Sequence, residues 1–273
     1  SLALAAESPA EPLNPIVITA SREPNDYGSA LTRLGLTGRT ILEMPDSATI
    51  IPRGLMDDQG ARGVLGLIGN DSSMGENYAP LGYYEILSIR GFTLDNASGY
   101  KRSGLTIANE SSMPLENKER VELLKGVAGF EAGLAAPGGV VNYVTKQPTD
   151  TPLRRITLEL SGRGTRYAHA DLGGRMGRFG YRFNAAHEEF QPYVKEAVGH
   201  REFLSSALDW RLGENAVFGI DADWQKKSQL SVPGYQPLGG TALPPDVRPE
   251  KMLNKQPWSE PVVVEAQNLG ARF

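Results

Sequence analysis

The chain has 273 residues, of which 40% are hydrophobic, and its 31 glycines and 19 prolines favour turns and loops over long helices. Its net charge of −4 argues against nucleic-acid binding, and the lack of cysteine excludes disulfides, zinc–thiolate sites and thiol catalysis. No apolar run approaches the ~18 residues of a transmembrane helix, so a soluble protein and a β-barrel remain, because closed barrels also span membranes.

Both ends of the sequence carry unusual signals. Residues 1–6 are small and apolar and resemble the end of a signal peptide, so we expect a signal-peptide remnant there; a plain apolar N-terminus is the alternative. Residues 269–273 lie inside a strand-like run that no turn signal follows. We therefore expect the chain to be a fragment of a longer protein.

Residues 7–40 are polar, rich in proline and without periodicity, which predicts a flexible segment. One β-branched island interrupts them: Ile16, Val17, Ile18, Thr19 and Ala20. A lone strand is not stable by itself but can add to the exposed sheet edge of a partner. The alternative is an ordinary edge strand of the domain that follows.

Residues 41–150 have the pattern of one compact mixed α/β domain. Short apolar and alternating runs predict strands over 48–51, 86–92, 120–125 and 138–146. Apolar residues at helical spacing predict a short amphipathic helix over 53–69, despite two glycines. Residues 93–114 are expected to be mostly polar loop.

The pattern changes after Pro148 to strict alternation of apolar and polar residues. On two of the runs, leucine, tryptophan and isoleucine share one face, while Asp209, Asp221 and Asp223 lie on the other. Each run is near the ~9–11 residues that a tilted membrane strand needs, although a soluble antiparallel domain would alternate too. The predicted strands are 154–162, 166–174, 178–190, 202–212, 216–227 and 262–273, with a long loop over 228–261.

Five motifs follow one another along the mixed α/β domain. They are PDS (45–47), MDDQG (56–60), IRGF (89–92), LENKERVELLKG (115–126) and APGGVVNYVTKQP (136–148). In this order they resemble the plug domain of TonB-dependent outer-membrane siderophore receptors, the ferrichrome-type family. The resemblance implies a mixed α/β plug domain (41–150), followed by antiparallel transmembrane β-barrel strands (151–273) that belong to an incomplete 22-stranded barrel.

The resemblance assigns the island at 16–20 as the TonB box. In the family this segment adds a strand to TonB, and TonB then pulls on the plug with energy that ExbB–ExbD supply. Main-chain hydrogen bonds provide the grip in such an addition, so uncharged β-branched residues suffice. The implied function is capture of a ferric siderophore and its import across the outer membrane of a Gram-negative bacterium. The implied partners are TonB, the siderophore and outer-membrane lipid.

Arg90 and Arg120 match two plug arginines of the family that pair with barrel glutamates. A guanidinium is always charged and can hold carboxylates bidentately, which suits a polar, reversible latch. The resemblance places the glutamates in strands beyond this chain. The alternative is that both arginines are solvated or paired within the plug.

The family binds its ligand on the outward loops of the plug, which correspond here to about 74–84, 95–103 and 107–112. Aromatic rings suit flat chelate faces, and amides or phenols can bond chelator carbonyls. The candidate ligand-binding residues are Tyr78, Tyr83, Tyr84, Asn96, Tyr100 and Asn109. The iron is held by the siderophore, so no protein cofactor or metal ligand is expected.

Other functions fit the sequence less well. The three histidines lack ligand spacing, and no nucleophile-elbow signature appears, so an enzyme is not expected. Haem, cobalamin, another metal chelate or an oligosaccharide are alternative ligands for the same machinery. The lack of a histidine-bearing motif disfavours haem. A soluble periplasmic β-rich binding protein is the alternative from another class.

Overall fold

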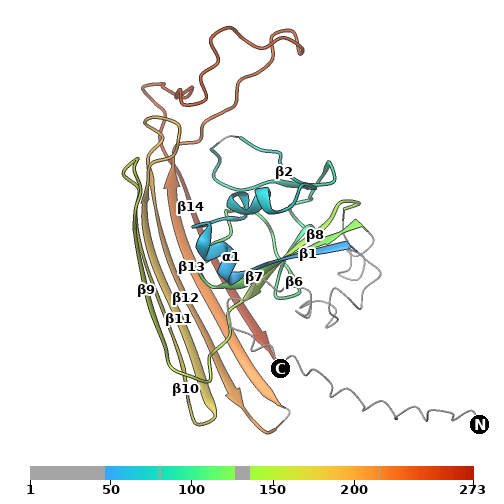
Figure 1. The fold of residues 1–273 in the computed structure, drawn as a ribbon, viewed down its shortest axis with the longest axis vertical. Coiled ribbons are helices and arrows are strands. Elements are labelled where there is room, and N and C mark those ends of the chain that lie inside the picture. The colour runs from blue at the N-terminus through green and yellow to red at the C-terminus, as the bar shows by residue number, and fades with distance from the viewer. Residues whose placement is uncertain (1–46, 80, 127–135, 215) are drawn as a thin grey trace, which may run out of the picture.

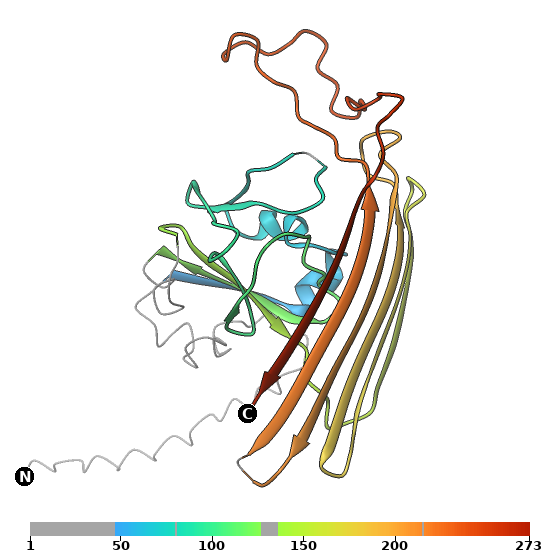
Figure 2. The ribbon, with the colours of Figure 1, turned by 180° about the vertical axis from the view of Figure 1, so that it is seen from behind.

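The computed structural model describes residues 47–79, 81–126, 136–214 and 216–273. They form a mixed α/β plug and a curved antiparallel sheet, the wall, with the plug on the inner, concave side of the wall (Figure 1). The same arrangement is seen from behind in Figure 2. The plug and the antiparallel strands of the predicted fold class are therefore present.

The plug is built on a five-stranded sheet in the order β1-β7-β8-β5-β6. β1 (Ser47–Pro52), β7 (Lys118–Lys125) and β8 (Gly139–Thr145) were each predicted to within a few residues. β5 (Tyr100–Arg102) and β6 (Leu105–Thr106) were missed, because residues 93–114 were expected to be loop. A Ser103–Gly104 turn with positive φ at both residues joins them, and such a pair favours a tight hairpin.

The helix predicted over 53–69 is wrong in extent. It is divided into α1 (Arg53–Asp58) and a 3-10 helix, η3 (Val64–Asn70). Gly60 between them has φ +60°, a left-handed conformation that ends helices. The apolar spacing survives the break, since Met56, Val64 and Leu67 all reach the core.

A smaller three-stranded sheet lies at the outward end of the plug. It contains β2 (Met74–Glu76), β3 (Leu87–Ile89) and β4 (Phe92–Thr93). The strand predicted over 86–92 is interrupted, because Arg90 and Gly91 form a turn with positive φ between β3 and β4. One hydrophobic core joins both sheets and α1.

The wall has six antiparallel strands, and each pairs with its neighbour in sequence. The six predicted runs all correspond to strands. They are β9 (Leu153–Leu160), β10 (Arg166–Met176), β11 (Phe179–Phe190), β12 (Gly199–Arg211), β13 (Val217–Gln229) and β14 (Val262–Arg272).

The two faces of the wall differ as the alternation predicted. Ile156, Leu204 and Trp210 point away from the plug, and each is more than half exposed. Asp171 and Asp223 face the plug and are buried. Because side chains alternate along a strand, one face of the wall is apolar and the other is charged.

The connections of the wall separate by length. The turns at 177–178 and 212–216 lie at one end, and the loops 191–198 and 230–261 lie at the other (Figure 1). The loop at 161–165 is short but lies at the long-loop end. Within the described ranges, no helix is long and apolar enough to cross a membrane.

Candidate functional site

Three tyrosines cluster on the plug segment between β2 and β3, which we call the tyrosine loop (residues 77–79 and 81–86). The rings of Tyr78 and Tyr84 stack with centroids 4.3 Å apart, and Tyr83 meets Tyr84 edge-on at 4.7 Å. Gly82 is needed here, because a Cβ would lie 2.3 Å from the Tyr78 ring. All three rings are half-buried, so the structure brings together three of the predicted ligand-binding residues.

Tyr100 and Asn109 require correction as ligand-binding candidates. Tyr100 is fully buried in the plug core, and its hydroxyl accepts a hydrogen bond from the Leu87 N–H at 3.0 Å. Asn109 is 2% exposed and donates its side-chain amide to the Glu85 carbonyl. Asn109 therefore holds the end of the tyrosine loop and Tyr100 holds the adjoining strand β3, and neither side chain is open to a ligand.

Asn96 is half-buried. Its carbonyl accepts the Asn109 N–H at 2.9 Å, which ties two plug loops together. A ligand contact by its side chain stays a prediction.

The two latch arginines occupy different settings. Arg90 is exposed at the β3–β4 turn. The Arg120 Nε lies 2.7 Å from Glu122 Oε1 on the same strand. Their pairing with barrel glutamates stays a prediction. The TonB box (16–20), the signal-peptide remnant (1–6) and the motif residues Pro45 and Asp46 lie outside the described residues.

The plug is joined to the wall by ion pairs that the sequence did not predict. In the first cluster, Arg102 of β5 contacts Asp221 and lies 3.0 Å from Asp223 on β13. The Asn117 side chain donates to Asp223 at 3.1 Å. All four residues are largely buried, so one guanidinium faces two carboxylates away from water.

The second cluster surrounds Arg201 on β12. Its guanidinium bonds Glu116 of the plug at 2.6 Å and Glu188 of β11 at 2.9 Å. The Tyr167 hydroxyl also donates to Glu116, at 3.2 Å. Burial alone would raise the pKa of Glu116, but the Arg201 guanidinium outweighs it and lowers this pKa to about 2.

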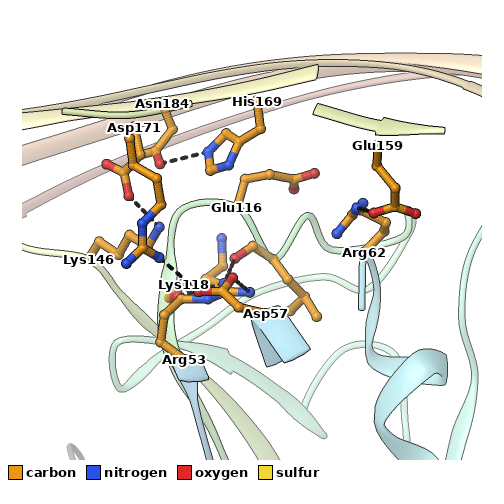
Figure 3. A network of polar contacts seen from close by, with 12 residues as sticks. Arg53, Asp57, Arg62, Glu116, Lys118, Lys146, Glu159, His169, Asp171 and Asn184 are labelled. Carbon is orange, nitrogen blue, oxygen red and sulfur yellow. Dashed lines mark hydrogen bonds and ion pairs between the residues drawn. The ribbon is translucent and has the colours of Figure 1, made fainter. Parts of the chain in front are cut away.

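The third cluster lies where the plug passes into the wall. Lys146 Nζ lies 2.6 Å from Asp171 of β10, and Arg182 of β11 donates to the same carboxylate at 2.6 and 2.8 Å. Figure 3 shows Asp171, Asn184 and His169 reaching from the wall toward the plug. At the edge of the interface, Arg62 pairs with Glu159 at 2.5 Å.

A lysine is buried beside the first cluster. Lys118 is fully buried and donates to the neighbouring Asn117 side chain. Burial lowers the pKa of Lys118 to about 8, with Asp223 opposing and Arg102 adding to the shift. The interface thus holds one fully buried lysine with a lowered pKa beside its arginine–carboxylate pairs.

A cavity of about 240 Å³ separates the tyrosine loop from the wall. Glu85, Arg201 and Lys227 help to line it. Glu85 is buried, and its Oε2 has no hydrogen-bond partner among the described residues. Burial raises the pKa of Glu85, which Lys227 opposes. Within the described ranges, no group of three or more His, Cys, Asp or Glu side chains is arranged to hold a metal ion.

One feature of the sequence indicated a polar surface at this interface. Charged residues recur at alternate positions of β10–β13, opposite the apolar face, and this predicts a polar inner surface. Their partners could not be predicted, since Arg102 and Asp221 are 119 positions apart in sequence. Only the folded arrangement selects which cation meets which carboxylate.

The plug matches a known family. Residues 40–140 match the model described as TonB-dependent receptor plug domain. The ferrichrome receptor FcuA of Yersinia enterocolitica is 26% identical over 212 residues, which cover 75% of this chain and 28% of that protein. The metal-pseudopaline receptor CntO of Pseudomonas aeruginosa is 30% identical over 237 residues, which cover 82% of this chain and 33% of that protein.

A solved structure shares the fold as well. The ferric preacinetobactin receptor BauA of Acinetobacter baumannii aligns with a TM-score of 0.72 and 26% identity, over 80% of this chain and 34% of that one. The chain spans about a quarter to a third of the length of the curated relatives. These matches confirm the resemblance that the plug motifs predicted. All three of these relatives are named as receptors.

Proposed function

We propose that this chain is the plug and adjoining wall of a TonB-dependent receptor in the outer membrane of a Gram-negative bacterium. In this proposal the whole protein binds a ferric siderophore and imports it into the periplasm, without enzymatic chemistry. The observation that carries the proposal is a plug-family domain seated on the charged inner face of a wall whose outer face is apolar.

The wall supports a position in lipid. An outward apolar face and an inward polar face are the arrangement of transmembrane barrels. β9 and β14 each pair on one side only within the described sheet. Backbone groups left open in lipid cost several kcal/mol each. We therefore propose that further strands close the wall into a barrel. The resemblance to the receptor family implies 22 strands in that barrel.

The plug–wall interface supports a plug that moves. Three separate ionic clusters join the plug to the wall. A continuous apolar core between them would make separation of the plug from the wall more costly, because apolar surface would become exposed to water. Polar contacts can be exchanged for water when the plug shifts. TonB, energised by ExbB–ExbD, would pull through the island at 16–20.

The ligand is proposed to be an iron chelate. The tyrosine cluster offers aromatic faces beside a cavity with several charged lining residues, which suits a chelator with planar groups and carbonyls. The 30% identical relative is named for metal-pseudopaline, so a complex of another transition metal with a chelator is the second candidate.

Growth under iron starvation tests the proposal. The full-length gene is compared with its deletion, with Ile18→Pro and with Leu13→Pro, a matched proline outside the island. Proline removes a backbone donor from the strand offered to TonB. One siderophore should support growth of the wild type and of Leu13→Pro, but not of the other two.

Two results would count against this function. Unchanged use of every siderophore after deletion, in a strain without other receptors, would remove the transport role. Normal growth of Ile18→Pro would remove the TonB box assignment while leaving transport intact. Uptake of labelled metal–pseudopaline, measured in the same strains, separates the second candidate from the first.

A further inference from the structure

Glu85 of the plug and Lys227 of the wall carry opposite charges and line the same cavity of about 240 Å³. Among the residues that the structure describes, neither side chain forms an ion pair. The charged groups of the three ionic clusters, by contrast, each lie against an opposite charge. The position of the plug in this structure, which we call the seated position, therefore leaves one carboxylate and one ammonium separate.

The Glu85 carboxylate is packed against the start of η3. Gly63 leaves room for it, because a Cβ at this position would lie 2.3 Å from Glu85 Oε1. Burial raises the pKa of Glu85, and the backbone N–H groups of Val64 and Leu65 oppose this shift. The Oε2 atom is buried and has no hydrogen-bond partner among the described residues. Glu85 therefore offers one acceptor atom for a further partner.

The Lys227 ammonium is bonded to the plug through a neutral group. Its Nζ donates to Ser112 Oγ at 3.2 Å and lies 5.8 Å from the centroid of the Phe190 ring. Two residues earlier on the same face of β13, Gln225 donates to Ser111 Oγ at 3.0 Å and to the Ser112 carbonyl at 2.9 Å. A hydroxyl carries no charge, so Ser112 holds the ammonium without neutralising it.

This separation of charge is unfavourable in the seated position. A charge removed from water without a counter-ion is costly, and an ion pair within a protein recovers part of that cost. Because Glu85 belongs to the plug and Lys227 to the wall, a displacement of the plug against the wall changes the distance between them. We infer that the two side chains form an ion pair in a second position of the plug, which it takes during transport. The displacement rests on the proposed function, whereas the two unpaired charges do not.

The second position exchanges one partner of Lys227 for another. In the seated position the ammonium bonds the neutral Ser112 hydroxyl, and in the second position it bonds the Glu85 carboxylate. A hydrogen bond between two charged groups is stronger than one between neutral groups. The new pair thus offsets part of the free energy lost when the ionic clusters separate, and Glu85 and Lys227 act as positioning residues for the displaced plug.

Disulfide trapping in cells tests the second position. The reporters are Leu65→Cys and Gln229→Cys, which line the cavity from the plug and from the wall and leave the charged pair intact. This chain contains no cysteine, and any cysteine elsewhere in the full-length receptor is changed to serine. Because formation of the pair narrows the cavity, the disulfide yield should be about fivefold higher in energised cells than in cells that lack TonB.

Removal of either charge should abolish this increase. Glu85→Gln and Lys227→Met approximately keep the size of each side chain, and both should lower the yield in energised cells to that of cells without TonB. Asp95→Asn is the matched control, since this plug carboxylate bonds Ala97 and Ser98 of its own loop, and it should keep the increase. An unchanged increase in Glu85→Gln would overturn the ion pair. A high yield without TonB would overturn the second position, because the cavity would then close in the seated plug.

A purified full-length receptor separates this inference from the proposed function. Arg102→Met weakens the seated position in the absence of TonB and ligand. It should raise the disulfide yield about fivefold when Glu85 and Lys227 are both present, and not in Glu85→Gln. An equal rise in Glu85→Gln would rule out the pair. If Arg102→Met raises the yield and TonB does not, the pair stands and the TonB-driven step of the proposed function fails.

Uptake rates test whether the pair serves transport. The probes are ferrichrome and a metal–pseudopaline complex, and whichever the wild type imports is used. Glu85→Gln and Lys227→Met should each slow uptake about threefold with unchanged affinity, and the double variant should be no slower than either one, because both remove the same interaction. Slowdowns that multiply in the double variant would contradict the shared role. If neither probe is imported, the proposed ligand class fails, and disulfide trapping still decides the pair.

Discussion

Arg102 of the plug and Asp223 of the wall form an ion pair of 3.0 Å at the buried centre of the plug–wall interface. Asp221 contacts the same guanidinium from the same strand. A single plug cation thus lies against two wall carboxylates that are two residues apart on the inner face of β13.

Arg102→Met is expected to destabilise the seated plug by about 3–5 kcal/mol, because it takes from two buried carboxylates the cation that lies closest to them. The measurement is denaturant unfolding of the full-length receptor, combined with protease cleavage of the plug. Arg248→Met is the matched control, since its pair with Asp246 is exposed and is worth roughly 0–1 kcal/mol. Equal stability of the two variants would contradict a structural role for the cluster.

Glu116 is expected to make stability depend on acid pH. Its pKa in the folded protein is about 2, below the ordinary 4.5, so its ion pair with Arg201 stabilises the fold above pH 4.5 and is lost as the pH falls through 2. The difference corresponds to roughly 3 kcal/mol. Glu116→Gln should reduce the change of the unfolding free energy with pH between pH 4.5 and 2. Glu196→Gln, in an exposed pair, should keep the wild-type slope.

Two tyrosines that the sequence treated alike are expected to behave differently. Tyr84→Ala removes a half-buried ring of the cluster and should weaken ferrichrome or metal–pseudopaline binding about tenfold, or roughly 1.4 kcal/mol. Tyr100→Phe removes the acceptor of the Leu87 N–H and should cost about 1 kcal/mol of stability with little change in affinity. Titration calorimetry and unfolding separate the effects, and the reverse pattern would place Tyr100 in the binding surface.

Leu204 tests the orientation of the wall in lipid. It lies near the middle of β12 on the apolar face and is 54% exposed. Leu204→Arg should destabilise the barrel by about 2–4 kcal/mol if that face meets the bilayer core. Leu243→Arg, in a loop, should have no such effect. The measurement is folding of the full-length receptor into lipid vesicles, and equal folding of both variants would place the face outside lipid.

Much of the architecture could be predicted from local patterns. All six wall strands were predicted, because alternation is a property of neighbouring residues and sets which face each side chain takes. The β-strands at 47–52, 118–125 and 139–145 followed from apolar runs in the same way. The plug motifs predicted the family that the comparisons then matched. The tyrosine cluster followed from three tyrosines within one loop.

Tertiary structure decided the rest. Tyr100 and Asn109 looked like surface loop residues, but the packing of β5 against β8 and of two plug loops buries them. The break at Gly60 depended on a left-handed backbone that apolar spacing does not reveal. The sequence by itself determined which residues form the strands of the wall and which of its faces is charged. Only the fold decided that Arg102 meets Asp223 and that Glu85 and Lys227 line one cavity, because such residues are distant in sequence and are brought together by the way the plug sits against the wall.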